Sequence, residues 1–150
     1  MNNIQSSLVY LDIELYNNKY NLDQNSFDNL NAFKLLEYLR LKHFHFSKSF
    51  NLKLSNLKIL NLENCDKILL EENSCLNIQK LFIKKCSLDN KSSLLKFPKL
   101  EECILKENQN NIKDFINISS LKNLKIVEIN TLDLLELENI SLNKITLFLE

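Results

Sequence analysis

An apolar pattern recurs along this chain at intervals close to 21 residues. Leu57, Leu60, Leu62 and Cys65 have the spacing LxxLxLxxC, and the same spacing begins again at residues 78 and 100. The three apolar slots of LxxLxL also begin at residues 8, 36, 124 and 142, so the steps between the seven copies are 28, 21, 21, 22, 24 and 18 residues. A repeat of this length buries its apolar side chains only against its neighbours. The pattern therefore predicts a stack of coils.

Each copy combines two local patterns. The LxL part has the two-residue period of a strand, and the LxxL part before it suits a turn or a short helical segment. We expect the strands to pair in a parallel sheet whose solvent face carries positions three, five and seven. Position nine follows the strand where the chain bends inward, so its side chain must satisfy backbone groups there. Asn108 suits this task, and Cys65 and Cys86 suit it more weakly, whereas Phe44 departs from the pattern.

Residues 57–65, 78–86 and 100–108 match every defining slot of LxxLxLxxN/C, and in this the chain resembles the leucine-rich repeat family. The resemblance covers nearly the whole sequence. It implies an α/β solenoid, the leucine-rich repeat horseshoe, with a parallel sheet on the concave face and short helical turns or irregular segments on the convex face. Apolar residues that step by three predict such helical turns around residues 27–33 and 112–121, and the insertion is expected to carry a helix around residues 23–33.

The length and composition predict one domain. A chain of 150 residues that is 45% hydrophobic can bury a single core. We expect a degenerate first repeat and an insertion over residues 1–35, regular repeats over about 36–150, and an incomplete C-terminal end. Ends of this kind leave apolar coils uncapped, so self-association through them is one expectation.

Charge and glycine content exclude several function classes. Lys+Arg and Asp+Glu both number 19, so no overall field attracts nucleic acid or an anionic membrane. The asparagine-rich chain contains no glycine, which excludes glycine-built phosphate loops, dinucleotide turns and nucleophile elbows. The sequence shows no signal peptide and no apolar run long enough to span a bilayer. A cytoplasmic location is therefore expected.

The cysteines and histidines predict no catalytic or metal site. The four cysteines contain no CxxC pair, and the repeat accounts for each of them as a core position or a ninth position. A Cys65–Cys86 disulfide between adjacent coils and a Cys65–His43 dyad are the alternatives. Buried thiols and surface histidines are favoured over both. No enzyme activity, cofactor or metal is therefore predicted.

Apolar residues in the outward slots predict a binding surface. Ile59, Phe82, Ile104 and Ile126 fall on four successive copies, whereas a solvated sheet face should be polar. An apolar centre with a charged rim is the arrangement of a protein interface. High β-propensity of Ile and Phe alone is the competing explanation. The lysines of this face could instead hold RNA, but neighbouring glutamates cancel much of their field, so no nucleic-acid partner is predicted.

These features predict a non-catalytic protein–protein interaction module that binds a protein partner on the concave sheet face. The alternative is a structural fragment of a larger leucine-rich repeat receptor, adaptor or surface protein with no binding role of its own. The candidate partner-binding residues are Ile59, Phe82, Ile104, Ile126, Tyr38, Lys84 and Lys106.

Overall fold

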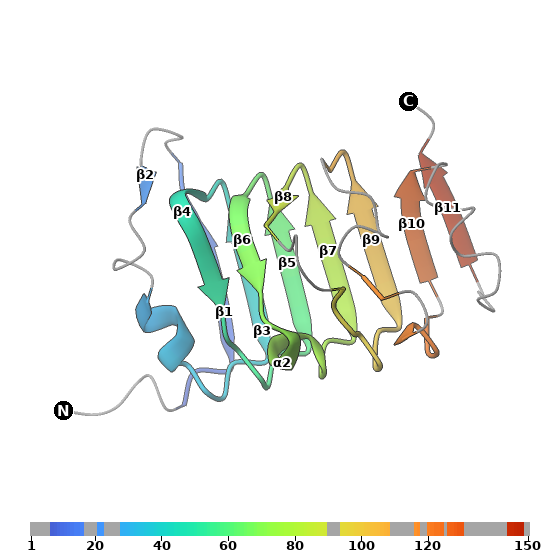
Figure 1. The fold of residues 1–150 in the computed structure, drawn as a ribbon, viewed down its shortest axis with the longest axis horizontal. Helices are drawn as coiled ribbons and strands as arrows, with labels where there is room; N and C mark the ends of the chain where they lie inside the picture. Colours follow the sequence, from blue (N-terminus) through green and yellow to red (C-terminus); the bar gives the residue numbers. More distant parts are fainter. Residues whose placement is uncertain are drawn as a thin grey trace.

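The chain forms a parallel β-solenoid with two layers of strands (Figure 1). The computed structural model describes residues 7–16, 21–22, 28–89, 94–108, 116–117, 120–124, 126–130 and 144–148. Sheet A has seven strands in the order β1 (Tyr10–Glu14), β3 (Tyr38–Lys42), β5 (Ile59–Glu63), β7 (Lys80–Lys84), β9 (Glu102–Lys106), β10 (Ile126–Asn130) and β11 (Lys144–Phe148). Sheet B has four strands in the order β2 (Asn21–Leu22), β4 (His45–Leu52), β6 (Asp66–Leu70) and β8 (Ser87–Leu88).

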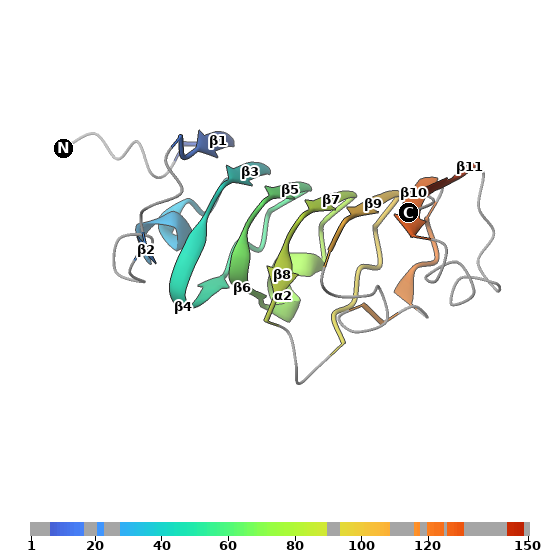
Figure 2. The ribbon, with the colours of Figure 1, turned by 90° about the horizontal axis from the view of Figure 1, so that it is seen from above.

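The predicted stack of coils is confirmed by sheet A. Each of its strands occupies positions three to seven of one copy of the repeat. All neighbours pair in parallel, and position four of one copy lies opposite position four of the next, as in Leu39 with Leu60 and Leu60 with Leu81. Seen from above, the strands of sheet A follow a shallow arc whose open side faces away from sheet B (Figure 2).

The repeated apolar residues form one continuous core between the two sheets. On strands β3, β5, β7 and β9, positions four and six are at most 3% exposed, whereas positions three, five and seven are all partly exposed. Alternate side chains of a strand point to opposite faces, so this burial pattern follows directly from LxL. Burying each leucine contributes about 2 kcal/mol, but only if the next coil covers it.

The second layer contains more strand and less helix than the sequence pattern predicts. Helical turns within the described segments include the 3-10 helix η2 (Asp28–Ala32), which lies inside the predicted 23–33 segment, and the four-residue helix α2 (Glu72–Cys75). Most of the predicted 112–121 turn lies outside the described residues. The eight-residue strand β4 forms because Phe46, Phe50 and Leu52 are buried on one side of an extended segment that is bulged before Phe50.

The corners after the strands of sheet A require a left-handed backbone. Position eight has a positive φ in four successive copies, at His43 (63°), Asn64 (51°), Lys85 (53°) and Glu107 (52°). Glycine adopts this conformation at no steric cost, whereas other L-residues pay about 1–2 kcal/mol. Since the chain has no glycine, the stacking of the coils must offset this cost at each corner.

The predicted role of position nine is confirmed. Asn108 accepts a hydrogen bond from the Cys86 amide (2.9 Å) and donates one to the Ile83 carbonyl (2.7 Å). The Cys86 sulfur accepts from the Cys65 amide (3.4 Å), and the Cys65 thiol donates to the Leu41 carbonyl (3.3 Å). Position nine thus connects each coil to the one before it through backbone groups that water does not reach.

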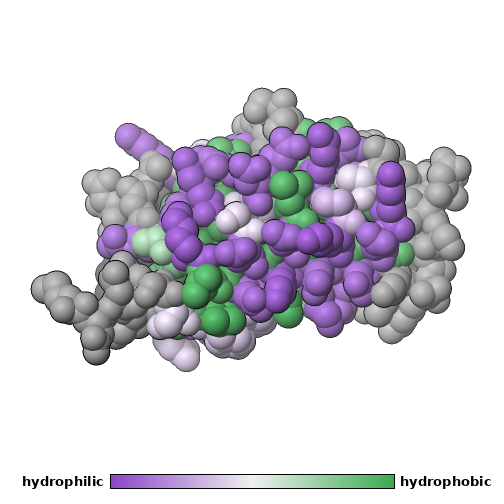
Figure 3. Space-filling view, turned by 90° about the horizontal axis from the view of Figure 1, so that it is seen from below, coloured by the Kyte–Doolittle hydropathy of each residue, from purple (hydrophilic) through white to green (hydrophobic). Residues whose placement is uncertain are grey.

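Asparagines connect the coils at the opposite corner, where the strands of sheet A begin. Asn56, Asn77 and Asn123, each one residue before a copy, donate to backbone carbonyls of the preceding coil over 2.6–2.9 Å. Figure 3 views this end of the solenoid, and most of its described surface is hydrophilic. Part of the high asparagine content therefore serves the stacking of the coils.

Candidate protein-binding surface

The outer face of sheet A consists of positions three, five and seven, and these form three rows that run across the strands. The structure places the predicted residues in neighbouring pairs: Tyr38 lies beside Ile59 in row three, Phe82 beside Ile104 in row five, and Lys84 beside Lys106 in row seven. The backbone of Ile126 is in register with Glu102, and its side chain lies outside the described residues. Six of the seven predicted residues therefore share one described face.

A pocket of about 380 Å³ opens at the start of row three. The rings of Tyr10 and Tyr38 stack in parallel, with centroids 4.1 Å apart and an interplanar angle of 7°. Val9 and Tyr10 remain 47% and 57% exposed. Burial raises the pKa of the Tyr38 phenol above its ordinary value, and a hydrogen bond with Tyr10 adds to the effect. We call this site the tyrosine pocket; its lining residues are Val9, Tyr10, Glu37, Tyr38, Lys58, Ile59 and Gln79.

The tyrosine pocket is an apolar site within a polar end of the molecule. Figure 3 shows green and near-white side chains together on the β1 side of this end, among purple ones. An ion pair between Lys58 and Glu37 (2.8 Å) borders the pocket. The sequence pattern identified Tyr38 and Ile59 but not Val9, which precedes the first strand and belongs to no outward slot. Rigid tyrosines beside a charged border are typical of binding hot spots.

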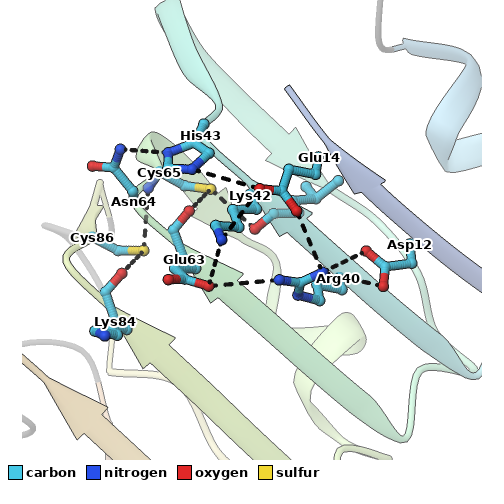
Figure 4. A network of polar contacts seen from close by, with 11 residues as sticks. Asp12, Glu14, Arg40, Lys42, His43, Glu63, Asn64, Cys65, Lys84 and Cys86 are labelled. Carbon is cyan, nitrogen blue, oxygen red and sulfur yellow. Dashed lines mark hydrogen bonds and ion pairs between the residues drawn. The ribbon is translucent and has the colours of Figure 1, made fainter. Parts of the chain in front are cut away.

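A closed network of ion pairs covers rows five and seven on strands β1, β3 and β5 (Figure 4). Arg40 contacts both carboxylate oxygens of Asp12 (3.1 and 3.2 Å) and reaches Glu63 (3.6 Å). Lys42 pairs with Glu14 (3.2 Å) and Glu63 (3.7 Å). Burial acts to lower the pKa of Arg40, but the three carboxylates around it hold that pKa above its ordinary value. These charges satisfy one another and leave little to attract a ligand.

Strands β7 and β9 carry a different pattern on the same face. In row three, Lys80 pairs with Glu102 (3.0 Å). In row five, Phe82 and Ile104 are partly exposed neighbours. In row seven, Lys84 and Lys106 lie side by side. An ion pair, an apolar pair and a lysine pair thus succeed one another along the strand direction.

All four cysteines lie in the core, and the two at position nine also link neighbouring coils. Cys65, Cys75, Cys86 and Cys103 are all buried thiols, so the alternative Cys65–Cys86 disulfide is not formed. A hydrogen bond with Cys86, together with burial, raises the pKa of Cys65. The ring of His43 contacts Asn64 (2.8 Å) while the Cys65 thiol donates to a carbonyl of another strand. The structure does not bring Cys65 and His43 together as a nucleophile and base.

A second pocket, of about 240 Å³, lies at the corner between the end of sheet A and the start of sheet B. His45 contacts Asp66 there through Nδ1 and Oδ2 (3.0 Å), and Lys85 pairs with Glu107 (3.2 Å). The repeat pattern did not identify the His45–Asp66 pair because both residues follow the motif. Within the described segments, no cluster of three or more His, Cys, Asp or Glu side chains is arranged to hold a metal ion.

Comparison with models of known families, with curated proteins and with solved structures finds no match for this chain. Among the described residues, no helix has the length and apolar character needed to cross a bilayer.

Proposed function

We propose that this chain is a divergent leucine-rich repeat protein and a non-catalytic module that binds a protein partner on the outer face of sheet A. The observation that carries the binding proposal is the tyrosine pocket, where Val9 and Tyr10 are about half exposed beside Tyr38 and Ile59. Such a surface loses contact with water when a partner covers it, which favours association.

The distribution of side chains over the face supports the same proposal. From the tyrosine pocket, the apolar residues continue diagonally from Ile59 in row three of β5 to Phe82 in row five of β7 and on to Ile104. Ion pairs border this diagonal on both sides, at Arg40 with its carboxylates and at Lys80 with Glu102. An apolar centre with a charged rim is the anatomy of a protein interface. The arc of sheet A would let a partner contact several strands at once.

Site-specific photo-crosslinking tests the proposal. A photoreactive benzoylphenylalanine at Asn61, between Arg40 and Phe82 in row five, should crosslink one defined protein in cells. The same group at Lys48, an exposed residue of β4 in sheet B, is the control. The crosslink should disappear when Phe82→Glu and Ile104→Glu are introduced together.

The matched control for this double variant is Leu94→Glu, since Leu94 is a 49% exposed apolar residue outside sheet A. Circular dichroism verifies that the variants fold. The proposal fails if Asn61 and Lys48 crosslink the same proteins, or if Phe82→Glu with Ile104→Glu leaves the crosslink intact. Crosslinks between copies of the chain alone would favour the structural alternative.

A further inference from the structure

Strand β1 has an unpaired main-chain edge. It is an end strand of sheet A, and among the described strands it pairs only with β3 (Figure 2). The Leu15 amide, directly after β1, donates to the Lys42 carbonyl of β3 (3.1 Å). Successive residues of a parallel strand bond to opposite sides, so the amides and carbonyls of Tyr10, Asp12 and Glu14 point away from β3. Such an edge is a template on which another strand can pair.

The apolar side chains of β1 are also incompletely covered. Leu11 and Ile13 hold positions four and six, and both are partly exposed, whereas these positions are buried on β3, β5, β7 and β9. On the outer face, the Tyr10 ring stacks on Tyr38 and Tyr10 still remains 57% exposed. A further strand beside β1 would therefore remove apolar surface from water on both faces of sheet A.

The outward carboxylates of β1 determine which strand would fit. Positions five and seven are Asp12 and Glu14 on β1, whereas they are Arg40 and Lys42 on β3. Glu63 of β5 also contacts both cations, so three carboxylates share two positive charges (Figure 4). Opposite charges on neighbouring strands stabilise a sheet, and like charges destabilise it. The edge of β1 therefore favours a strand with cations at these two positions over an acidic one.

We infer that β1 binds an extended basic segment of another protein, which adds to sheet A as a further parallel strand. The inference goes beyond the proposed function, because the contact is made by the edge of sheet A and not by its outer face. The segment carries an aromatic residue opposite Tyr10, apolar residues opposite Leu11 and Ile13, and Arg or Lys opposite Asp12 and Glu14. Strand β3 already presents this series to the other side of β1, as the run Tyr-Leu-Arg-Leu-Lys.

Peptides with blocked main-chain donors test the strand pairing. The probe is acetyl-Ser-Tyr-Leu-Arg-Leu-Lys-Ser-amide, added to the isotope-labelled full chain. In the parallel register its two leucine amides donate to the Tyr10 and Asp12 carbonyls, so N-methylation of both leucines should abolish binding. N-methylation of its Tyr and Arg, whose amides point away from β1, is the matched control and should change affinity by less than about threefold. Amide NMR should show slower hydrogen exchange at Tyr10, Asp12 and Glu14 when the probe is bound.

Reversal of charge tests the chemistry of the segment. An analogue with Asp and Glu in place of Arg and Lys should bind at least about tenfold more weakly than the probe, a gap that narrows as salt rises. Asp12→Asn with Glu14→Gln should reduce this gap. Glu102→Gln with Glu107→Gln, the same loss of charge on and directly after β9, should preserve it. Amide spectra verify that both variants fold, and the N-methylated pair tests the pairing without any variant.

Four results would overturn the inference. One is absent binding of the probe, and another is equal binding of the two N-methylated peptides or of the basic and acidic peptides. The third is slow exchange at Tyr10, Asp12 and Glu14 before any peptide is added, which would mean that the chain covers its own edge. The fourth is a response confined to Phe82 and Ile104, which would place the peptide on the outer face and leave the proposed function standing while this inference fails.

Discussion

Single side chains at position nine hold neighbouring coils together. Asn108 supplies both an acceptor and a donor to the backbone of the coil before it. A thiol does the same less strongly, because sulfur is a weak donor and a weak acceptor. On the two preceding coils the thiols repeat part of this arrangement, since Cys86 accepts from the Cys65 amide and Cys65 donates to the Leu41 carbonyl. The hydrogen bonds that position nine makes between coils are therefore strongest after β9, where the residue is Asn108.

Asn108→Ala should lower the free energy of unfolding by about 2 kcal/mol, because the Cys86 amide and the Ile83 carbonyl would lose their partner. Urea denaturation measures this change. Asn61→Ala is the control, since Asn61 lies on the outer face and its substitution should change stability by less than about 0.5 kcal/mol. Equal losses in the two variants would contradict the structural role of Asn108.

The buried thiol of Cys75 should make stability fall at alkaline pH. Burial raises its pKa, and the nearby carboxylate of Glu72 raises it further, so the folded thiol keeps its proton above pH 9.0, where the unfolded thiol ionises. Unfolding then releases a proton, and this contribution to stability decreases by up to about 1.4 kcal/mol per pH unit. Urea titrations from pH 7 to about pH 10 should show a shallower decline for Cys75→Ala. Parallel curves would exclude this linkage.

The corners that follow strands of sheet A have a left-handed backbone conformation that glycine would suit best, but this chain contains no glycine. Four successive corners are left-handed, and of their residues His43 and Asn64 belong to types enriched in this conformation, whereas Lys85 and Glu107 do not. Two consecutive lysines differ in backbone conformation: Lys84 is the last residue of strand β7, whereas Lys85 is left-handed, with a φ of 53°.

Lys85→Gly should raise the free energy of unfolding by up to about 1 kcal/mol, because it removes the steric cost of the left-handed backbone. The ion pair of Lys85 with Glu107 is half exposed and contributes little. Lys84→Gly should lower stability by a similar amount, since glycine weakens a strand. Thermal unfolding of both variants measures the difference. A loss of stability in Lys85→Gly would mean that its contacts outweigh the backbone cost.

The regularity of each strand determined whether it could be predicted from the sequence. The LxL spacing predicted all seven strands of sheet A because burial of alternate residues is a local, repeated requirement. Strand β4 was missed because the exposed Lys48, in the bulged stretch between His45 and Phe50, stands where the two-residue period of Phe46, Phe50 and Leu52 would place an apolar residue. The tyrosine pocket was only half predicted, since Val9 is at position two of the first copy, which is not an outward slot, and the stacking of Tyr10 on Tyr38 depends on register.

The molecule as a whole is most tightly packed in its middle coils. Leu39, Leu60 and Leu81 are fully buried, whereas Leu11, at the same position of the first copy, is only partly buried. A solenoid is stabilised coil by coil through nearest neighbours, so stability should decrease toward β1.

Leu81→Ala should cost about 3–4 kcal/mol, and Leu11→Ala should cost about half of that or less, because Leu11 already contacts water. Hydrogen exchange should follow the same order, with amides of β5 and β7 exchanging more slowly than those of β1. Uniform protection across sheet A would show instead that the solenoid opens as a single unit.

Because the strands of sheet A pair in strict register, the distances between sites on its outer face are set by the number of strands between them. The tyrosine pocket lies on β1, β3 and β5, and the apolar pair of Phe82 and Ile104 lies on β7 and β9, so main-chain hydrogen bonding alone sets the span between them. Duplicating a single coil between β5 and β7 would lengthen that span by one strand spacing, about 4.8 Å, without altering either anchor point. A lineage of such chains could therefore change the reach of its recognition surface by gaining or losing whole repeats, and leave the chemistry of each contact untouched.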